Sequence, residues 1–315
     1  MRVCITGGTG FVGRAVVRVL LSRGHEVVAL VRDPAAARAV LPQGVALVPG
    51  GLADADALAA MFREHRPQAL AHLAWEGLPD YSEANSLKNL DYGTALYGLA
   101  ADHGVETVLT TGSCWEYEGR QGCLAEDAPL GTAKAFPAAK SALRRAGLAL
   151  ARERGLDFYW LRLFYVYGPG QHGHSLLPTI INAALAGSEP PLRSPGNKND
   201  FVHVDDVALA CALTLEKKPG PDIDKTGTYN VGSGTVARVA DAASLVYEAL
   251  GAPVPEGLPD GLKAFLAEAA PPPPAEDFWA DMTRTRADTG FVARIGLREG
   301  VAGMLRLAQE QRGQR

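Results

Sequence analysis

A glycine-rich segment near the N-terminus has the residue types and spacing of a phosphate-binding loop. The segment TGGTGFVG (6–13) follows an apolar stretch, RVCIT (2–6), and a helical pattern starts at Phe11. Its glycines fit G-x-G-x-x-G from Gly8 and G-x-x-G-x-x-G from Gly7. Glycines here allow a tight turn and a close approach of the main chain to a pyrophosphate, which the helix N-terminus faces. The sequence therefore predicts a dinucleotide-binding site.

The end of the next apolar stretch, EVVALV (26–31), bears on which dinucleotide binds. Arg32 and Asp33 follow it directly. An acidic residue at this point bonds the ribose 2′-hydroxyl of NAD, whereas an arginine accepts the 2′-phosphate of NADP. Because Arg32 comes first after the stretch, we predict NADP and keep NAD as the alternative.

Other chemistries have weak support in the sequence. His172 and His174 lie in a glycine-rich loop with no third ligand at a recognisable spacing, so no metal is predicted. Ser113 has no G-x-S-x-G context, which disfavours acyl transfer. The four cysteines show no C-x-x-C spacing, and we expect reduced thiols in a cytoplasmic protein.

Short apolar stretches alternate with helical patterns through the first half of the chain, which predicts βαβ units. The stretches are apolar on both faces, as in a parallel sheet covered by helices on both sides. We therefore predict an α/β fold with a doubly wound parallel sheet, the Rossmann arrangement. Besides 2–6 and 26–31, strands are expected at 45–49, 69–74, 106–111 and 157–164, and helices at 11–23, 85–102 and 134–153.

The alternation weakens after about residue 167, which indicates a second unit. We predict a dinucleotide-binding domain at 1–166, to which 200–233 returns. The segments 167–199 and 234–315 are expected to form a smaller C-terminal substrate-binding lobe. Within it, the proline-rich stretch 251–278 is expected to be an irregular lobe or lid.

Composition excludes several partner classes. The chain has 315 residues, of which 47% are hydrophobic and 21% charged, enough for a sizeable core. The net charge is −4 without a basic stripe, so nucleic acid is not expected as a partner. No apolar run approaches the roughly 18 residues of a membrane span. The N-terminal residues lack a signal-peptide pattern, which favours the cytoplasm.

Taken together with the glycine loop, several motifs occur in an order that resembles the extended short-chain dehydrogenase/reductases, the family of sugar-nucleotide epimerases, dehydratases and reductases. These motifs are HLA (72–74), TGSCWEY (111–117), Lys140, RLFYVYGPGQ (162–171) and DFVHVDDVA (200–208). HLAWEGLPDY (72–81) and TGSCWEYEG (111–119) are most similar to the branch that reduces 4-keto-6-deoxy sugar nucleotides. The resemblance covers nearly the whole chain.

The resemblance implies roles for matching residues. Ser113 matches the residue that bonds the reacting oxygen, and Lys140 matches the lysine that holds the nicotinamide ribose. The implied cofactor-binding residues are Gly7, Gly10, Phe11, Val12, Arg32, Asp33, Leu73, Ala74, Thr111 and Lys140. The family also implies a homodimer through the helices at 85–102 and 134–153.

Phe136 stands where the family has its catalytic tyrosine, four residues before Lys140. That tyrosine exchanges a proton with the substrate oxygen, and loss of a general acid commonly costs about 10²–10⁴-fold in rate. Four interpretations stay open. Another group donates the proton, the chemistry needs no such tyrosine, the phenylalanine was introduced deliberately, or the protein binds a cofactor without catalysis. Candidate replacement donors are Tyr117, Tyr165, Glu116 and Lys140.

Further departures from the family narrow the reaction. Family dehydratases carry Asp-Glu directly after the catalytic Ser/Thr, whereas Cys114 and Trp115 stand here, which disfavours sugar dehydration. Glu116 comes one position later and is expected to face the opposite way if the strand continues. We therefore expect an NAD(P)-dependent reductase or epimerase that acts at a keto or carbinol carbon of a nucleotide-linked deoxysugar.

The sequence has fewer of the arginines with which the family binds the substrate's diphosphate. Asn199 replaces an arginine that the family often has, and the stretch 275–277 lacks a second one. Arg193, Lys198 and Arg284 are expected to compensate; otherwise the substrate is a non-sugar natural product. The expected substrate contacts are Trp75, Trp115, Tyr165, Leu176, Lys198 and Arg284.

Overall fold

The large sheet has seven strands, all parallel, in the order β11-β7-β5-β4-β1-β2-β3. The structure is a computed structural model that describes residues 1–131, 133–217, 226–255 and 277–313. The strands are β1 (Arg2–Thr6), β2 (Glu26–Val31), β3 (Ala46–Pro49), β4 (Ala69–His72), β5 (Thr107–Ser113), β7 (Asp157–Leu163) and β11 (Thr226–Val231). This strand order confirms the predicted doubly wound fold.

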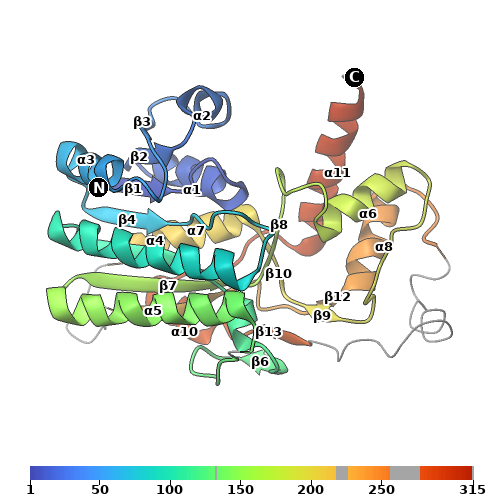
Figure 1. Ribbon diagram of the computed structural model, residues 1–315. Coiled ribbons are helices and arrows are strands. Elements are labelled where there is room, and N and C mark those ends of the chain that lie inside the picture. The colour runs from blue at the N-terminus through green and yellow to red at the C-terminus, as the bar shows by residue number, and fades with distance from the viewer. Residues whose placement is uncertain (132, 218–225, 256–276, 314–315) are drawn as a thin grey trace.

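Helices cover both faces of this sheet (Figure 1). One face packs against α1 (Phe11–Ser22), α2 (Pro34–Val40) and α7 (Val204–Leu215), and the other against α3 (Ala55–His65), α4 (Glu83–Asp102) and α5 (Ala135–Arg154). Alternation along a strand explains why both faces are apolar. In β1, Val3 and Ile5 join the core cluster beside α1, whereas Cys4 joins the opposite cluster.

The smaller lobe contains three helices that share their own hydrophobic cluster: α6 (Leu176–Leu185), α8 (Val239–Leu250) and α11 (Leu297–Gly313). In Figure 1 they stand together beside the large sheet. A parallel pair links β8 (Tyr165–Tyr167) to β10 (Phe201–His203). A second small sheet has the order β12-β9-β13-β6, with bounds β12 (Ala237–Arg238), β9 (Lys198–Asn199), β13 (Phe278–Ala280) and β6 (Gly122–Leu124).

Two features bear on the predicted division of the chain. The helix α10 (Thr283–Thr289) packs beside β11 and α7 rather than in the α6–α8–α11 cluster. Most of the expected lid at 251–278 lies outside the described residues, as do two residues of the stretch 275–277. The domain boundaries therefore stay a prediction.

The strands β4 and β5, which lead into the candidate site, end at other residues than the sequence predicted. β4 ends at His72, so Leu73 and Ala74 belong to the following loop. β5 runs on to Ser113, and a short 3-10 helix, η1 (Cys114–Tyr117), follows directly. Because parallel strands place their carboxyl ends at one edge, the loops after β1, β4 and β5 meet there.

Candidate functional site

Backbone geometry in the loop after β1 shows which glycines are required. Gly7 has φ of +75°, and a Cβ on it would lie 2.8 Å from the backbone nitrogen of Ala74. A Cβ on Gly13 would lie 1.9 Å from the carbonyl oxygen of Gly7. At Gly8 the nearest atom is a side-chain methyl of Ile5 at 3.3 Å. The loop therefore follows the G-x-x-G-x-x-G pattern that starts at Gly7. At Gly7 and Gly13 the neighbouring atoms belong to the backbone, so a side chain has no room.

A cavity of about 450 Å³ opens beside this loop. The loops after β2, β3 and β4 complete its wall, and Trp75 and His172 reach it as well. Of the predicted cofactor residues, those in the lining are Gly7, Gly10, Phe11, Val12, Arg32, Leu73 and Ala74. The predicted residues Asp33, Thr111 and Lys140 do not contribute to this lining. A cleft at the N-terminus of α1 with a glycine cradle fits a dinucleotide pyrophosphate.

The two charged residues after β2 have different roles. The carboxylate of Asp33 caps α2, because its Oδ1 accepts hydrogen bonds from the backbone nitrogens of Ala35 and Ala36 at 2.9 and 3.0 Å. Arg32 instead lines the cleft. The carboxylate of Asp33 is therefore engaged in capping the helix, whereas Arg32 is among the residues that line the cleft.

Ser113 ends β5, and its side chain caps η1. Its Oγ accepts a hydrogen bond from the backbone nitrogen of Trp115 at 3.2 Å, and Glu116 Oε1 accepts one from the backbone nitrogen of Ser113 at 3.0 Å. This reciprocal capping turns the chain at Ser113, so the strand does not continue to Glu116 and the alternation expected for a continuing strand does not apply. Because the Ser113 oxygen accepts from the backbone, its O–H proton remains available to a ligand.

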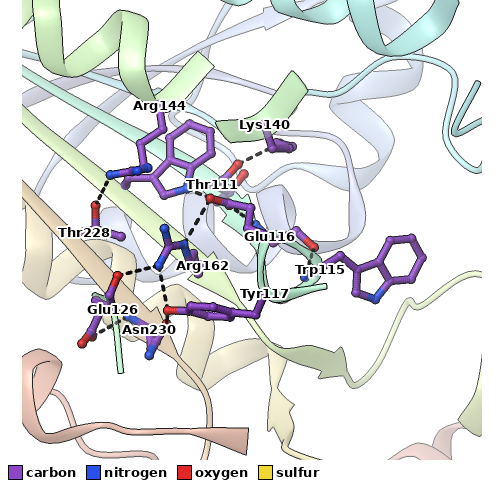
Figure 2. A network of polar contacts seen from close by, with 12 residues as sticks. Thr111, Trp115, Glu116, Tyr117, Glu126, Lys140, Arg144, Arg162, Thr228 and Asn230 are labelled. Atoms are coloured by element: carbon purple, nitrogen blue, oxygen red, sulfur yellow. Dashed lines mark hydrogen bonds and ion pairs between the residues drawn. The ribbon is translucent and has the colours of Figure 1, made fainter. Parts of the chain in front are cut away.

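Glu116 and Tyr117 belong to a buried polar network (Figure 2). Glu116 pairs with Arg162 at 3.1 Å, and both side chains are at most 1% exposed. Arg162 also donates to the Tyr117 hydroxyl at 2.7 Å, and that hydroxyl donates to Oδ1 of Asn230 at 2.7 Å. Burial raises the pKa of Tyr117 to about 12, although Arg162 opposes the shift. Sequence reasoning missed this network; its signal was Arg162 within the apolar strand DFYWLRLF (157–164).

Lys140 lies on α5, and its ammonium contacts the end of β5 and a ring from the loop after β4. Its Nζ donates to the carbonyl oxygen of Thr111 at 2.8 Å and lies 4.2 Å from the centre of the Trp75 ring. Burial lowers the pKa of Lys140 to about 8, and the Glu116 charge opposes this shift. The charged form is nevertheless stabilised by the carbonyl and by the ring face. The structure thus brings Thr111, Trp75 and Lys140 together.

Phe136 lies one helical turn before Lys140 and is the centre of an aromatic cluster. Its ring centroid is 5.3 Å from that of Trp75, 5.2 Å from Tyr81 and 5.8 Å from Trp115. These edge-to-face arrangements are favourable for aromatic rings. Figure 2 shows that Trp115 points away from the polar network formed by its neighbours Glu116 and Tyr117. Tyr81 was missed by sequence reasoning, although it ends the motif HLAWEGLPDY (72–81).

The other expected substrate residues lie in different surroundings. Tyr165 packs against Phe201 and Phe278, with ring centroids 6.2 and 6.0 Å away. Leu176 lines a separate cavity of about 460 Å³. Lys198 faces Asp277 at 4.0 Å. The remaining residue, Arg284, contacts Asp288 at 3.9 Å and the Tyr229 ring at 5.7 Å.

Among the residues that the structure describes, no three His, Cys, Asp or Glu side chains are grouped so as to hold a metal ion. Within these same ranges, no helix has the length and apolar character needed to cross a membrane.

The parallel sheet, the glycine cradle at α1 and the buried lysine near the cleft define a Rossmann-fold enzyme of the nicotinamide-dependent class. The chain belongs to the NAD dependent epimerase/dehydratase family, whose profile matches residues 3–232. It is accordingly an extended short-chain oxidoreductase or epimerase, as the sequence predicted.

Individual relatives show the range of this family. The chain is 26% identical over 236 residues to dTDP-6-deoxy-L-talose 4-dehydrogenase (NAD(+)) of Aggregatibacter actinomycetemcomitans, covering 74% of this chain and 85% of that protein. It is 30% identical over 276 residues to a 3-diazoavenalumate denitrifying reductase of Streptomyces sp, covering 84% and 87%. The solved structure of MoeE5 with UDP-glucuronic acid and NAD is similar with a TM-score of 0.81, 27% identity, and coverage of 99% and 100%.

Proposed function

We propose that this protein reduces the carbonyl group of a nucleotide-linked keto-deoxysugar to an alcohol, with NADPH as the hydride source. The observation that carries the proposal is the placement of Ser113 and Lys140. Ser113 ends β5, and Lys140 is anchored to Thr111 of the same strand end. Similarity to a 6-deoxy-talose 4-dehydrogenase supports a keto sugar as the substrate.

The chain's own residues divide the remaining work. A bound dihydronicotinamide supplies a hydride, and the protein must orient the acceptor carbonyl and stabilise the charge that develops on its oxygen. Ser113 has an O–H available to bond that oxygen, since its Oγ accepts from Trp115. The Lys140 ammonium holds the nicotinamide ribose and places a positive charge in a desolvated site.

Reduction fits Phe136 better than epimerisation does. An epimerase must first take a proton from an alcohol, which requires a base held at the reacting oxygen, and then return one. Phe136 offers no such group, and Glu116 is paired with Arg162. A reductase needs only one proton per turnover. The negative charge that develops on the carbonyl oxygen during hydride transfer already favours protonation of that oxygen.

Arg32 supports NADP over NAD. It lines the cleft while the Asp33 carboxylate caps α2, so the arginine rather than the acid is available to bind a 2′-phosphate. Guanidinium groups recognise phosphate through paired hydrogen bonds. NAD is the cofactor named for the talose dehydrogenase relative and is bound in MoeE5, and it remains the alternative here.

The separate cavity beside α6 supports a nucleotide-linked substrate. Leu176 and Arg193 both line it, together with Asn197 and Ser194. Its volume of about 460 Å³ is in the range of small-molecule sites, and a guanidinium in its wall suits a phosphate. We propose that Arg193, rather than Arg284, supplies the grip on the substrate's diphosphate.

The test is oxidation of NADPH and NADH with a panel of 4-keto-6-deoxy sugar nucleotides, followed by absorbance of the reduced cofactor. NADPH oxidation that requires a member of the panel and falls in Arg193→Ala supports the proposal. Tight cofactor binding without turnover on any substrate class would instead indicate a non-catalytic binding protein.

A second candidate is reduction of a non-sugar aromatic compound. Rings of Trp75, Tyr81, Trp115 and Phe136 cluster together, and one relative is a denitrifying reductase that acts on a diazo compound. Replacement of a diazonium group by hydride releases N₂ and needs no general acid, which would suit a phenylalanine at 136. Turnover of an aryl diazo compound but of no keto sugar would favour this candidate.

We also propose a homodimer through α4 and α5, which pack side by side on one face (Figure 1). Leu87 on α4 is 50% exposed, which fits an interface residue. Sedimentation should show a dimer that Leu87→Asp weakens, whereas a monomer for the unmodified chain would contradict the proposal.

A further inference from the structure

Tyr81 is the phenol whose ring lies against Phe136. The two ring centroids are 5.2 Å apart with planes at 74°, and the Tyr81 ring also contacts Trp115 at 5.1 Å. The Phe136 ring centroid also lies 5.9 Å from the Nζ of Lys140. A hydroxyl-bearing ring therefore borders the position at which the resemblance places a catalytic tyrosine.

The loop that carries Tyr81 is held by two buried asparagines of α4. The Asn85 amide nitrogen donates to the carbonyl oxygens of Glu76 at 2.9 Å and Asp80 at 2.8 Å. Asn89 accepts from the backbone nitrogen of Glu76 at 2.7 Å and donates to its carbonyl at 3.1 Å. These bonds satisfy the backbone groups of Glu76 and Asp80, which have no partner in a helix or sheet because they lie in a loop. The position of Tyr81 is therefore determined by specific contacts rather than by an unattached loop.

Competing donors near the end of β5 are engaged elsewhere. The Tyr117 hydroxyl is buried between Arg162 and Asn230, and Glu116 is paired with Arg162. Among the described residues, the Tyr81 hydroxyl makes no such bond, and the residue is 43% exposed. The usual pKa of a tyrosine is about 10, so the Tyr81 phenol is protonated at neutral pH, and burial of the ring raises this pKa further. It can thus donate a proton and recover one from water.

We propose that Tyr81 is the proton donor of the reduction, in place of the tyrosine that Phe136 replaces. As hydride adds to the carbonyl carbon, the C=O π pair moves to oxygen, which takes the phenolic proton of Tyr81. The phenolate then regains a proton from solvent, so each turnover consumes one hydride and one proton. This assignment rests on the proposed carbonyl reduction.

Five proteins test the assignment: the unmodified chain, Tyr81→Phe, Phe136→Tyr, the double variant and the control Tyr92→Phe. Tyr81→Phe should lower kcat by about 10²–10⁴-fold, the range for loss of a general acid, with the NADPH dissociation constant unchanged. The double variant should recover turnover, because it restores a phenol on α5 four residues before Lys140. The Tyr92 ring on α4 lies 6.0 Å from the Nζ of Lys88, and the control variant Tyr92→Phe should retain full turnover.

A binding experiment separates failure of this assignment from failure of the proposed function. NADP⁺ adds positive charge near the site and should lower the pH at which one tyrosine ionises, seen as tyrosinate absorbance. The change should be present in the unmodified chain and absent in Tyr81→Phe. If no keto sugar is turned over but this difference is seen, the reaction is wrong and the placement of Tyr81 stands. The assignment would be overturned if Tyr81→Phe turned over substrate as fast as the unmodified chain. It would also be overturned if the variant still showed the change in tyrosine ionisation.

Discussion

The ammonium of Lys140 lies 4.2 Å from the centre of the Trp75 ring and donates to the Thr111 carbonyl oxygen at 2.8 Å. The two contacts come from loop and strand ends on neighbouring strands, β4 and β5. They hold the buried Lys140 charge beside the cofactor cleft. Removing this charge from water costs free energy, and an apolar side chain at this position would avoid that cost. Such a cost is typical of a functional group.

Replacing Lys140 by methionine should weaken NADPH binding while stabilising the fold. Loss of the proposed charged hydrogen bonds between Lys140 and the ribose predicts a dissociation constant raised about 10-fold or more. For the unmodified chain, affinity should also fall as the pH rises through the lowered pKa of about 8. Titration calorimetry across pH measures both effects. Equal affinity in the two proteins would contradict a role at the ribose.

The stability effect of the same variant has a defined pH dependence. The folded-state pKa of Lys140 is about 8, below its usual 10.5, so between these values the unfolded chain binds more protons. The unmodified chain therefore gains stability as the pH rises through this window. The advantage of Lys140→Met in the free energy of unfolding should be largest below about pH 8 and shrink toward pH 10.5. Urea unfolding at several pH values tests this sign.

Glu116→Gln should destabilise the protein strongly. It leaves the Arg162 guanidinium buried without its carboxylate, a loss of about 3–5 kcal/mol for a broken buried pair. The matched control is Glu26→Gln, which breaks an exposed pair with Arg2 and should cost about 0–1 kcal/mol. Similar unfolding midpoints for the two variants would show that the network contributes little.

Tyr117→Phe should affect stability and not catalysis. Removal of its hydroxyl leaves buried polar groups of Asn230 and Arg162 without a hydrogen-bond partner. This should lower the free energy of unfolding by about 1–3 kcal/mol. Turnover by the folded fraction should match that of the unmodified chain. A general-acid loss of 10²–10⁴-fold would instead make Tyr117 the donor.

Arg32→Ala and Asp33→Ala should separate cofactor choice from helix capping. Arg32→Ala should raise the KM for NADPH by about 10-fold or more and leave that for NADH unchanged, because only NADPH carries the 2′-phosphate. Asp33→Ala should cost about 1 kcal/mol of stability, since its side chain caps α2, with the cofactor preference retained. If NADH affinity falls in Asp33→Ala, the acidic residue bonds the ribose.

Gly13→Ala should abolish cofactor binding, whereas Gly8→Ala should be tolerated. The added Cβ at Gly13 meets a backbone oxygen at 1.9 Å, but at Gly8 it meets a side-chain methyl at 3.3 Å. Fluorescence titration with NADPH compares them. Equal loss in both would mean that the loop tolerates no side chain at all.

Local sequence signals determined the α/β class and several candidate groups. The apolar stretch, the glycines and the helical pattern of the first 23 residues act over short distances, so they identify the loop after β1. The four-residue spacing from Phe136 to Lys140 likewise places both on one helical face. Arg162 within an apolar strand was a further local signal, because a buried arginine requires a buried partner.

Only the tertiary structure decided which side chains face each other. Arg32 and Asp33 are adjacent in sequence, and the capping of α2 decides which one lines the cleft. The turn at η1 ends the strand at Ser113 and thereby sets the direction of Glu116, whose carboxylate bonds back to Ser113 and pairs with Arg162 on β7. Tyr81 meets Phe136 because the order of β4 and β5 brings their following segments together. Contacts of this kind depend on sheet topology, which no local pattern contains.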